Sequence, residues 1–301
     1  MKSLKMLLPL ICLFLFLTFP NLTIEGTRTG LLLWYQNLLP AMLPFIIICG
    51  VILANHSEDL FCLPFYPIYR KKHFHKSLPF LFFVGFFCGY PLGAKILKDL
   101  YHNEEFSKTF ASYLLPFVSN ISPMFLLGYF HVNLLHESES VFFLVFAFYF
   151  PIFFILLLSY PCYKLYFKTT SIACNTKKHK KNNSNLDTVI LESFEIMLKI
   201  CGYMVLFSIF ILLGTKLFPI SQINLSCCFL EVTTGLKNLF SFSFNHPSQK
   251  IALAFALLNF GGLCSMFQVK SVTSKDFSFI WYIIAKGIIS SCSYYLVIFL
   301  F

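Results

Sequence analysis

Long apolar segments separated by short polar stretches run through the whole chain. Six of them have the length of a membrane-spanning helix, about 20 mostly apolar residues. They lie at residues 31–54, 109–130, 141–163, 196–218, 251–268 and 278–301. A further apolar run, from Leu7 to Phe19, follows Lys2 and Lys5. This run resembles a signal peptide, but no small-x-small cleavage pattern follows it, which favours an uncleaved first span or signal anchor.

Two other apolar segments are interrupted by residues that break helices. The segment at residues 78–93 contains Pro79, Gly85, Gly89, Pro91 and Gly93. The segment at residues 225–240 is short and contains Glu231, Thr233, Thr234, Gly235 and Lys237. Short segments of this kind between spans are typical of re-entrant or discontinuous helices. We therefore expect a re-entrant helical hairpin in each segment.

The distribution of charge supports this arrangement of spans and hairpins. With a cytoplasmic amino terminus, the basic stretches at residues 55–77 and 164–186 lie inside. The expected external loops at residues 21–30 and 241–250 hold one basic residue each. This asymmetry follows the positive-inside rule, by which cytoplasmic loops carry the excess of lysine and arginine.

The same topology divides the chain into two halves of opposite orientation. The sequence predicts an all-α polytopic integral membrane protein with two inverted-topology repeats, each with a re-entrant helical hairpin. The expected parts are an N-terminal span or signal anchor at residues 1–30, a first membrane repeat at 31–163, a basic cytoplasmic linker at 164–186 and a second, inverted repeat at 187–301. In many secondary transporters the broken helices of such repeats meet near the bilayer midplane.

Composition excludes several classes of protein. Of the 301 residues 57% are hydrophobic and only 12% are charged, whereas soluble domains carry about 25% charged residues. The net charge of +10 follows from the basic inside loops, so the lipid bilayer is the expected partner and nucleic acid is not. A homo-oligomer is left open. The 11 cysteines include no C-x-x-C pair, and no hydrolase, zinc-protease, phosphate-loop or dinucleotide signature occurs, so no enzyme activity, metal or cofactor is expected.

The first candidate site is the run from Gly89 to Lys95 in the first broken segment. Gly89 and Gly93 allow close backbone approach, and Pro91 breaks the helix. The helix that starts after the break directs unpaired N–H groups at the gap, which suits an anion. Lys95 adds a full charge there or, alternatively, extends to the lipid interface from a tight cytoplasmic turn. Tyr90 is a candidate for stacking on a planar ligand.

The second candidate site is a polar cluster in the middle of the span at residues 109–130. Ser119, Asn120 and Ser122 precede Pro123. Three small polar side chains can satisfy the carbonyls that a proline frees, which would be a structural role. Because the cluster lies so deep, we favour an unwound stretch that presents hydroxyl and amide groups to a substrate.

In the second half the candidates are Glu231, Thr233 and Thr234. A carboxylate in an apolar segment is costly unless it is paired or titrates. Glu231 is therefore a candidate ion-coupling site or the partner of Lys237 or Lys286, and an external interfacial charge is the alternative. Thr233 and Thr234 are candidate substrate-binding residues.

The last span but one adds Asn259 and Gln268 as candidate substrate-binding residues. Between them lie Gly261 and Gly262, which allow an unusual backbone or, alternatively, close helix packing.

Four of these runs, taken in order, resemble one family. They are residues 89–95 (GYPLGAK), 119–125 (SNISPMF), 230–235 (LEVTTG) and 260–268 (FGGLCSMFQ). Together they are similar to the sporulation integral membrane protein family, whose members carry the gate, or nucleoside recognition, domain. The resemblance covers about residues 31–301.

The resemblance implies a bacterial, multi-pass cell-membrane protein of endospore formers, with a fold distantly similar to nucleoside transporters. It implies movement of dipicolinic acid across the outer forespore membrane. Dipicolinate is a planar dianion, which would suit the helix ends, Lys95 and Tyr90. We therefore expect a sporulation-associated transporter or facilitator of a small anionic metabolite, dipicolinic acid, working by alternating access. The alternative is a non-transporting membrane scaffold or sensor for spore envelope assembly.

Overall fold

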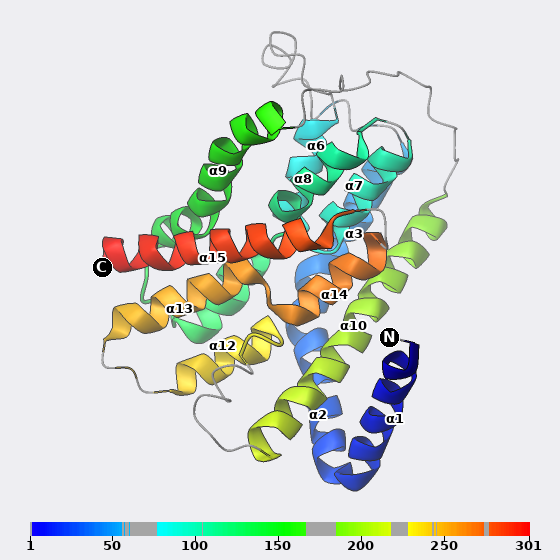
Figure 1. Ribbon diagram of the computed structural model, residues 1–301, viewed down its shortest axis with the longest axis vertical. Helices are drawn as coiled ribbons and strands as arrows, with labels where there is room; N and C mark the ends of the chain where they lie inside the picture. The colour runs from blue at the N-terminus through cyan, green and yellow to red at the C-terminus, as the bar shows by residue number, and fades with distance from the viewer. Residues whose placement is uncertain are drawn as a thin grey trace.

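The computed structural model describes residues 2–55, 57, 60, 77–103, 105–166, 185–217, 228–242, 244, 246–273 and 277–301. Over these residues all regular structure is helical (Figure 1). In chain order the elements are α1 (Lys2–Thr18), α2 (Pro20–Leu33), the π-helix η1 (Trp34–Leu38), α3 (Leu39–Ala54), α6 (Leu78–Phe87), α7 (Leu92–His102), α8 (Lys108–Val118), the π-helix η3 (Phe125–Leu134), α9 (Val141–Tyr166), α10 (Leu186–Leu217), α12 (Val232–Ser241), α13 (Pro247–Phe260), α14 (Gly262–Thr273) and α15 (Phe279–Leu300).

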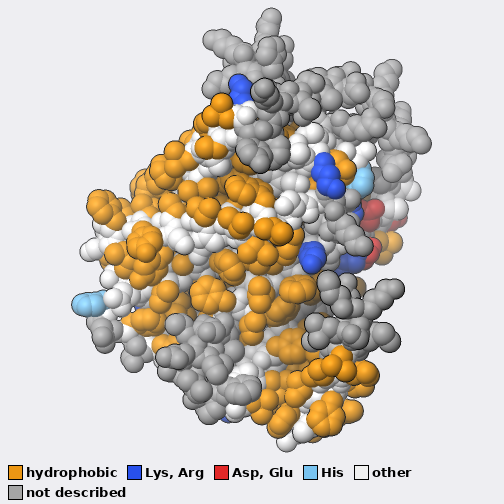
Figure 2. Space-filling model, in the orientation of Figure 1, with side chains coloured by type: hydrophobic (Ala, Val, Ile, Leu, Met, Phe, Trp, Pro, Cys, Tyr) orange, Lys and Arg blue, Asp and Glu red, His pale blue; other side chains and the backbone are white. Residues whose placement is uncertain are grey.

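Five helical stretches among the described residues are long and apolar enough to cross a membrane. They are Pro20–Ala54, Val141–Leu165, Leu186–Leu217, Pro247–Thr273 and Phe279–Leu300. In the described part of the face seen in Figure 2, hydrophobic side chains are the most frequent kind, and few charged groups lie among them. On α9 four exposed phenylalanines repeat every four residues: Phe142, Phe146, Phe150 and Phe154. The all-α polytopic membrane fold predicted from the sequence is confirmed.

The expected external loop at residues 21–30 is wrong, because these residues are helical. The chain turns at Phe19, and α2, η1 and α3 then follow without a break. Thr23 and Thr27 donate their hydroxyls to backbone carbonyls four residues earlier, which keeps these polar side chains compatible with a helix. A Cβ on Gly26 or Gly30 would lie 2.7 or 2.8 Å from the nearest Cα atom of α10, so the two backbones touch. Small residues four apart permit such packing in membranes.

The first predicted hairpin is present. Helices α6 and α7 are packed side by side, and the chain reverses at residues 88–91. A Cβ on Gly85 or Gly93 would lie 2.6 or 2.0 Å from the carbonyl oxygen of Val118, so only glycine fits between this hairpin and α8. The returning arm extends to His102, beyond the expected end at residue 93.

Both halves contain a helix that is broken in its middle. Between α8 and η3 the chain is unwound around residues 119–122, and between α13 and α14 it turns at Gly261, whose φ is +83°. In the first half Tyr90 N donates to Asn120 O, at 2.9 Å, and thereby joins the hairpin to the break. In the second half Cys264 N donates to Leu230 O, at 2.8 Å, in the corresponding place.

The order of elements in the second half, α10, α12, α13–α14 and α15, follows that of α3, α6–α7, α8–η3 and α9. In Figure 1, α6 and α7 lie in the upper part of the view and α12 in the lower part. This order agrees with two repeats, but their inverted relation stays a prediction. Most of the basic stretches at 55–77 and 164–186, and residues 225–227 of the second broken segment, lie outside the described residues.

Candidate functional site

The two broken segments and the two broken helices converge on one small buried cavity, which we call the polar cavity. Its volume is about 20 Å³, roughly the room of one water molecule. Six of the residues proposed from the sequence line it: Tyr90, Asn120, Ser122, Glu231, Thr233 and Gln268. Residues from both halves of the chain therefore form one site, as the sequence predicts for paired broken helices.

Asn120 organises the wall of the polar cavity formed by the first half. It is 1% exposed. Its Nδ2 donates to Phe117 O at 2.6 Å, and its backbone carbonyl accepts the N–H of Tyr90. Ser122 accepts the N–H of Phe125 at its Oγ and so caps η3. The polar cluster thus satisfies the unwound backbone and also presents an amide to the cavity.

Glu231 has a definite structural role on the opposite wall. It precedes α12, and its two carboxylate oxygens accept the N–H groups of Thr233 and Thr234 at 2.8 and 2.7 Å. An acidic side chain at this position satisfies free N–H groups and interacts favourably with the helix dipole. The alternative of an exposed interfacial charge is wrong, because Glu231 is 3% exposed.

The predicted pairing of Glu231 with Lys237 or Lys286 is also wrong. Among the described residues Glu231 forms no ion pair. Lys286 of α15 donates instead to Asn120 Oδ1, at 2.8 Å. This lysine is 2% exposed. The sequence offered it only as a partner for Glu231, although a lysine inside an apolar span is itself a signal of function.

The carboxyl-terminal half also contributes polar groups that have no partner in the described structure. Gln268 Nε2 contacts Cys264 Sγ at 3.3 Å, but its Oε1 is buried without a hydrogen bond. The hydroxyl of Thr234 is in the same situation. Ser265 also lines the polar cavity. The sequence analysis did not select it, although it belongs to the motif at residues 260–268.

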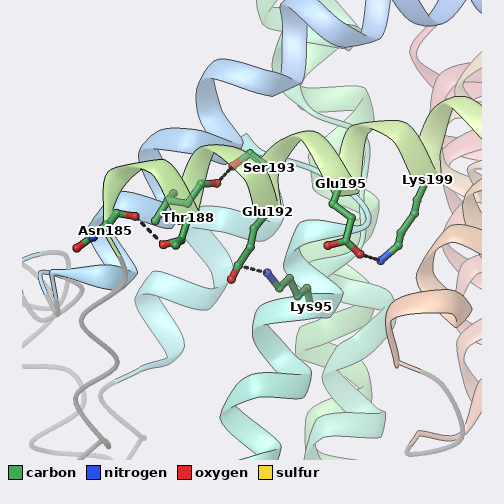
Figure 3. A network of polar contacts seen from close by, with 8 residues as sticks. Lys95, Asn185, Thr188, Glu192, Ser193, Glu195 and Lys199 are labelled. Atoms are coloured by element: carbon green, nitrogen blue, oxygen red, sulfur yellow. Dashed lines mark hydrogen bonds and ion pairs between the residues drawn. The ribbon is translucent and has the colours of Figure 1, made fainter.

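A much larger cavity of about 840 Å³, which we call the vestibule, adjoins this site. It lies between α3, α7, α10 and α14, and Gln268 lines both cavities. Charged residues of α7 and α10 line the vestibule, and Figure 3 shows Lys95 directed toward Glu192 and Glu195 directed toward Lys199. Lys95 Nζ lies 3.2 Å from Glu192 Oε2, and Lys199 Nζ lies 2.6 Å from Glu195 Oε1. These side chains are 34–65% exposed, so the vestibule opens to solvent.

The prediction that Lys95 belongs to the substrate-binding gap needs correction. Lys95 and Pro91 line the vestibule, and neither lines the polar cavity. The reason is geometric, since Lys95 lies one turn into α7 and its side chain turns toward α10.

Five other predicted residues do not line the polar cavity: Gly89, Gly93, Ser119, Thr234 and Asn259. The two glycines pack against the backbone of residues 118–122. Ser119 and Asn259 are fully buried, and Asn259 Nδ2 donates to Ser293 Oγ at 3.0 Å. These contacts indicate a structural role for the two glycines and for Asn259 in packing the broken helices.

Fold and site together define a polytopic membrane protein with a polar centre built from discontinuous helices. The chain is similar to the sporulation integral membrane protein YlbJ of Bacillus subtilis, with 29% identity over 124 residues. This match covers 38% of the present chain and 30% of that protein's length. No family model matches the chain, and no solved structure matches it. The match supports the predicted likeness to sporulation membrane proteins.

Proposed function

We propose that this chain is a transporter or facilitator of a small anionic metabolite, dipicolinic acid, in a membrane of the sporulating cell. The observation that carries the proposal is the convergence of both broken segments and both broken helices on one buried polar cavity. Discontinuous helices that present backbone and polar side chains at a common centre are the usual substrate sites of secondary transporters.

Buried polar groups without partners support transport over a purely structural role. An unpaired buried acceptor destabilises a fold by about 1–3 kcal/mol. Gln268 Oε1 is such an acceptor, and Gln268 lines both cavities. A membrane scaffold gains nothing from this unpaired oxygen, whereas a substrate could supply its missing partner.

The sizes of the two cavities support alternating access. Small-molecule sites have volumes of about 300–1,000 Å³. The vestibule falls in this range and the polar cavity does not. In this conformation a substrate therefore reaches the vestibule, and it enters the polar cavity only after the turn at residues 88–91 and the start of α12 move apart. Lys95 would meet the anion first, and the Tyr90 ring and the Asn120 amide would meet it in the centre.

The proposed location is the outer forespore membrane, where dipicolinate leaves the mother cell. The similarity to a sporulation membrane protein and the membrane-length helices support it. A fluorescent fusion followed through sporulation tests this part separately, with signal confined to the engulfing membrane as the expected result.

The decisive experiment is uptake of labelled dipicolinate into proteoliposomes that contain only this protein. We expect saturable uptake, and we expect Gln268→Leu to abolish most of it. Gln249→Leu is the matched control, because Gln249 is exposed at the start of α13, away from both cavities. Absence of uptake by folded wild-type protein would favour the alternative function, a scaffold or sensor of spore envelope assembly.

A further inference from the structure

Lys286 is a buried lysine without a counter-ion in the described structure. It belongs to the first half of α15 and is 2% exposed. Its Nζ donates to Asn120 Oδ1 at 2.8 Å. No carboxylate of the described residues forms an ion pair with it. Burying a charge without an opposite charge is strongly unfavourable, so a lysine in this place needs a reason beyond packing.

The other polar groups on the same face of α15 do not supply a negative charge. Ser290 Oγ donates to Ala256 O at 2.7 Å, and Ser293 Oγ contacts Ala147 O at 3.3 Å. Tyr282, one turn before Lys286, is fully buried and neutral. This face of α15 therefore places only uncharged side chains next to the Lys286 amine.

The position of Lys286 relative to the polar cavity is defined by Asn120. Asn120 lines the cavity, and its Oδ1 lies 2.8 Å from the ammonium. The charge is thus one side chain away from any molecule that occupies the cavity. The carboxylate in the wall of the polar cavity, that of Glu231, already accepts two N–H groups of α12. The missing counter-ion of Lys286 is therefore what an anionic substrate would bring.

We infer that Lys286 supplies the positive charge that selects an anion at the polar cavity, and that it acts through Asn120 as a positioning residue. The inference rests on the proposed function and assigns its substrate selectivity to the protein core, whereas the sequence placed this charge at Lys95. At a separation of roughly 6 Å and an effective dielectric constant of about 20, one unit charge changes anion binding by about tenfold or more.

The test compares dipicolinate with its neutral diamide, pyridine-2,6-dicarboxamide, in the proteoliposome assay. For Lys286→Gln we expect the KM for dipicolinate to rise by at least about tenfold, and the inhibition constant of the diamide to stay unchanged. Lys286→Arg keeps the charge and should restore the anion preference. Lys250→Gln removes a lysine that contacts Phe240 O and lines neither cavity, and it serves as the control for loss of charge.

A second variant keeps the test meaningful if Lys286→Gln does not fold. Lys286→Met removes the amine but keeps an unbranched apolar side chain that suits a buried helix face, so we expect folded protein with a lower affinity for dipicolinate. The inference is overturned if either folded variant retains the wild-type KM for dipicolinate, or if the diamide is affected equally. If wild-type protein takes up neither compound, the proposed function itself has failed, which is a different outcome.

Discussion

The cap formed by Glu231 allows the structural and the ion-coupling readings of this residue to be separated. Replacing Glu231 with alanine leaves the N–H groups of Thr233 and Thr234 buried without an acceptor. Each unsatisfied buried donor costs about 1–3 kcal/mol, so the free energy of unfolding should fall by about 2–6 kcal/mol. Glu231→Asp keeps a capping carboxylate and should cost less than about 1 kcal/mol.

The measurement is equilibrium unfolding in mixtures of dodecyl sulfate and a mild detergent, followed by loss of helical circular dichroism. Glu25→Ala is the control, because Glu25 is exposed on α2. Uptake by Glu231→Asp should stay close to wild type if capping is the whole role of Glu231. An alanine variant as stable as the wild type would refute the cap. A stable aspartate variant that no longer concentrates substrate would instead show ion coupling.

Three further outcomes follow from contacts outside the polar cavity. Mild oxidation by copper–phenanthroline should join Cys49 to Cys88, whose sulfur atoms lie 3.1 Å apart. The disulfide links the first hairpin to α3 and should reduce uptake. Full uptake by the linked protein would mean that this hairpin does not move. Gly30→Leu should lower the free energy of unfolding by about 1–3 kcal/mol, because a Cβ there already lies 2.8 Å from the α10 backbone; unchanged stability would contradict this packing. Lys95→Gln removes an exposed ion pair with Glu192 and should lower the free energy of unfolding by less than about 1 kcal/mol. The KM for dipicolinate should stay within about threefold of wild type at physiological salt. A tenfold rise in this KM would place the selecting charge in the vestibule.

Much of the fold was predictable because membrane insertion depends on local composition. Apolar length alone identifies helices such as α9 and α15, since every backbone group in lipid must be satisfied within its own helix. Glycines and prolines in residues 78–93 identified the first hairpin for the same reason. The polar run at residues 21–30 was misread as a loop, because its threonines bond within the helix and its glycines pack on α10.

The sequence by itself therefore determined the class of protein, the broken segments and most of the polar side chains that line the polar cavity. Only the tertiary structure decided how the charges are partnered. Lys95 meets Glu192 across 97 positions of the chain, and Lys286 meets Asn120 across 166. Hydrophobic pattern acts over one helix at a time, whereas the partner of a buried charge depends on which distant helix packs against it. Glu231 is different, because the N–H groups that bind it lie only two and three residues away. The sequence did not identify this contact because it did not show that a helix begins at residue 232.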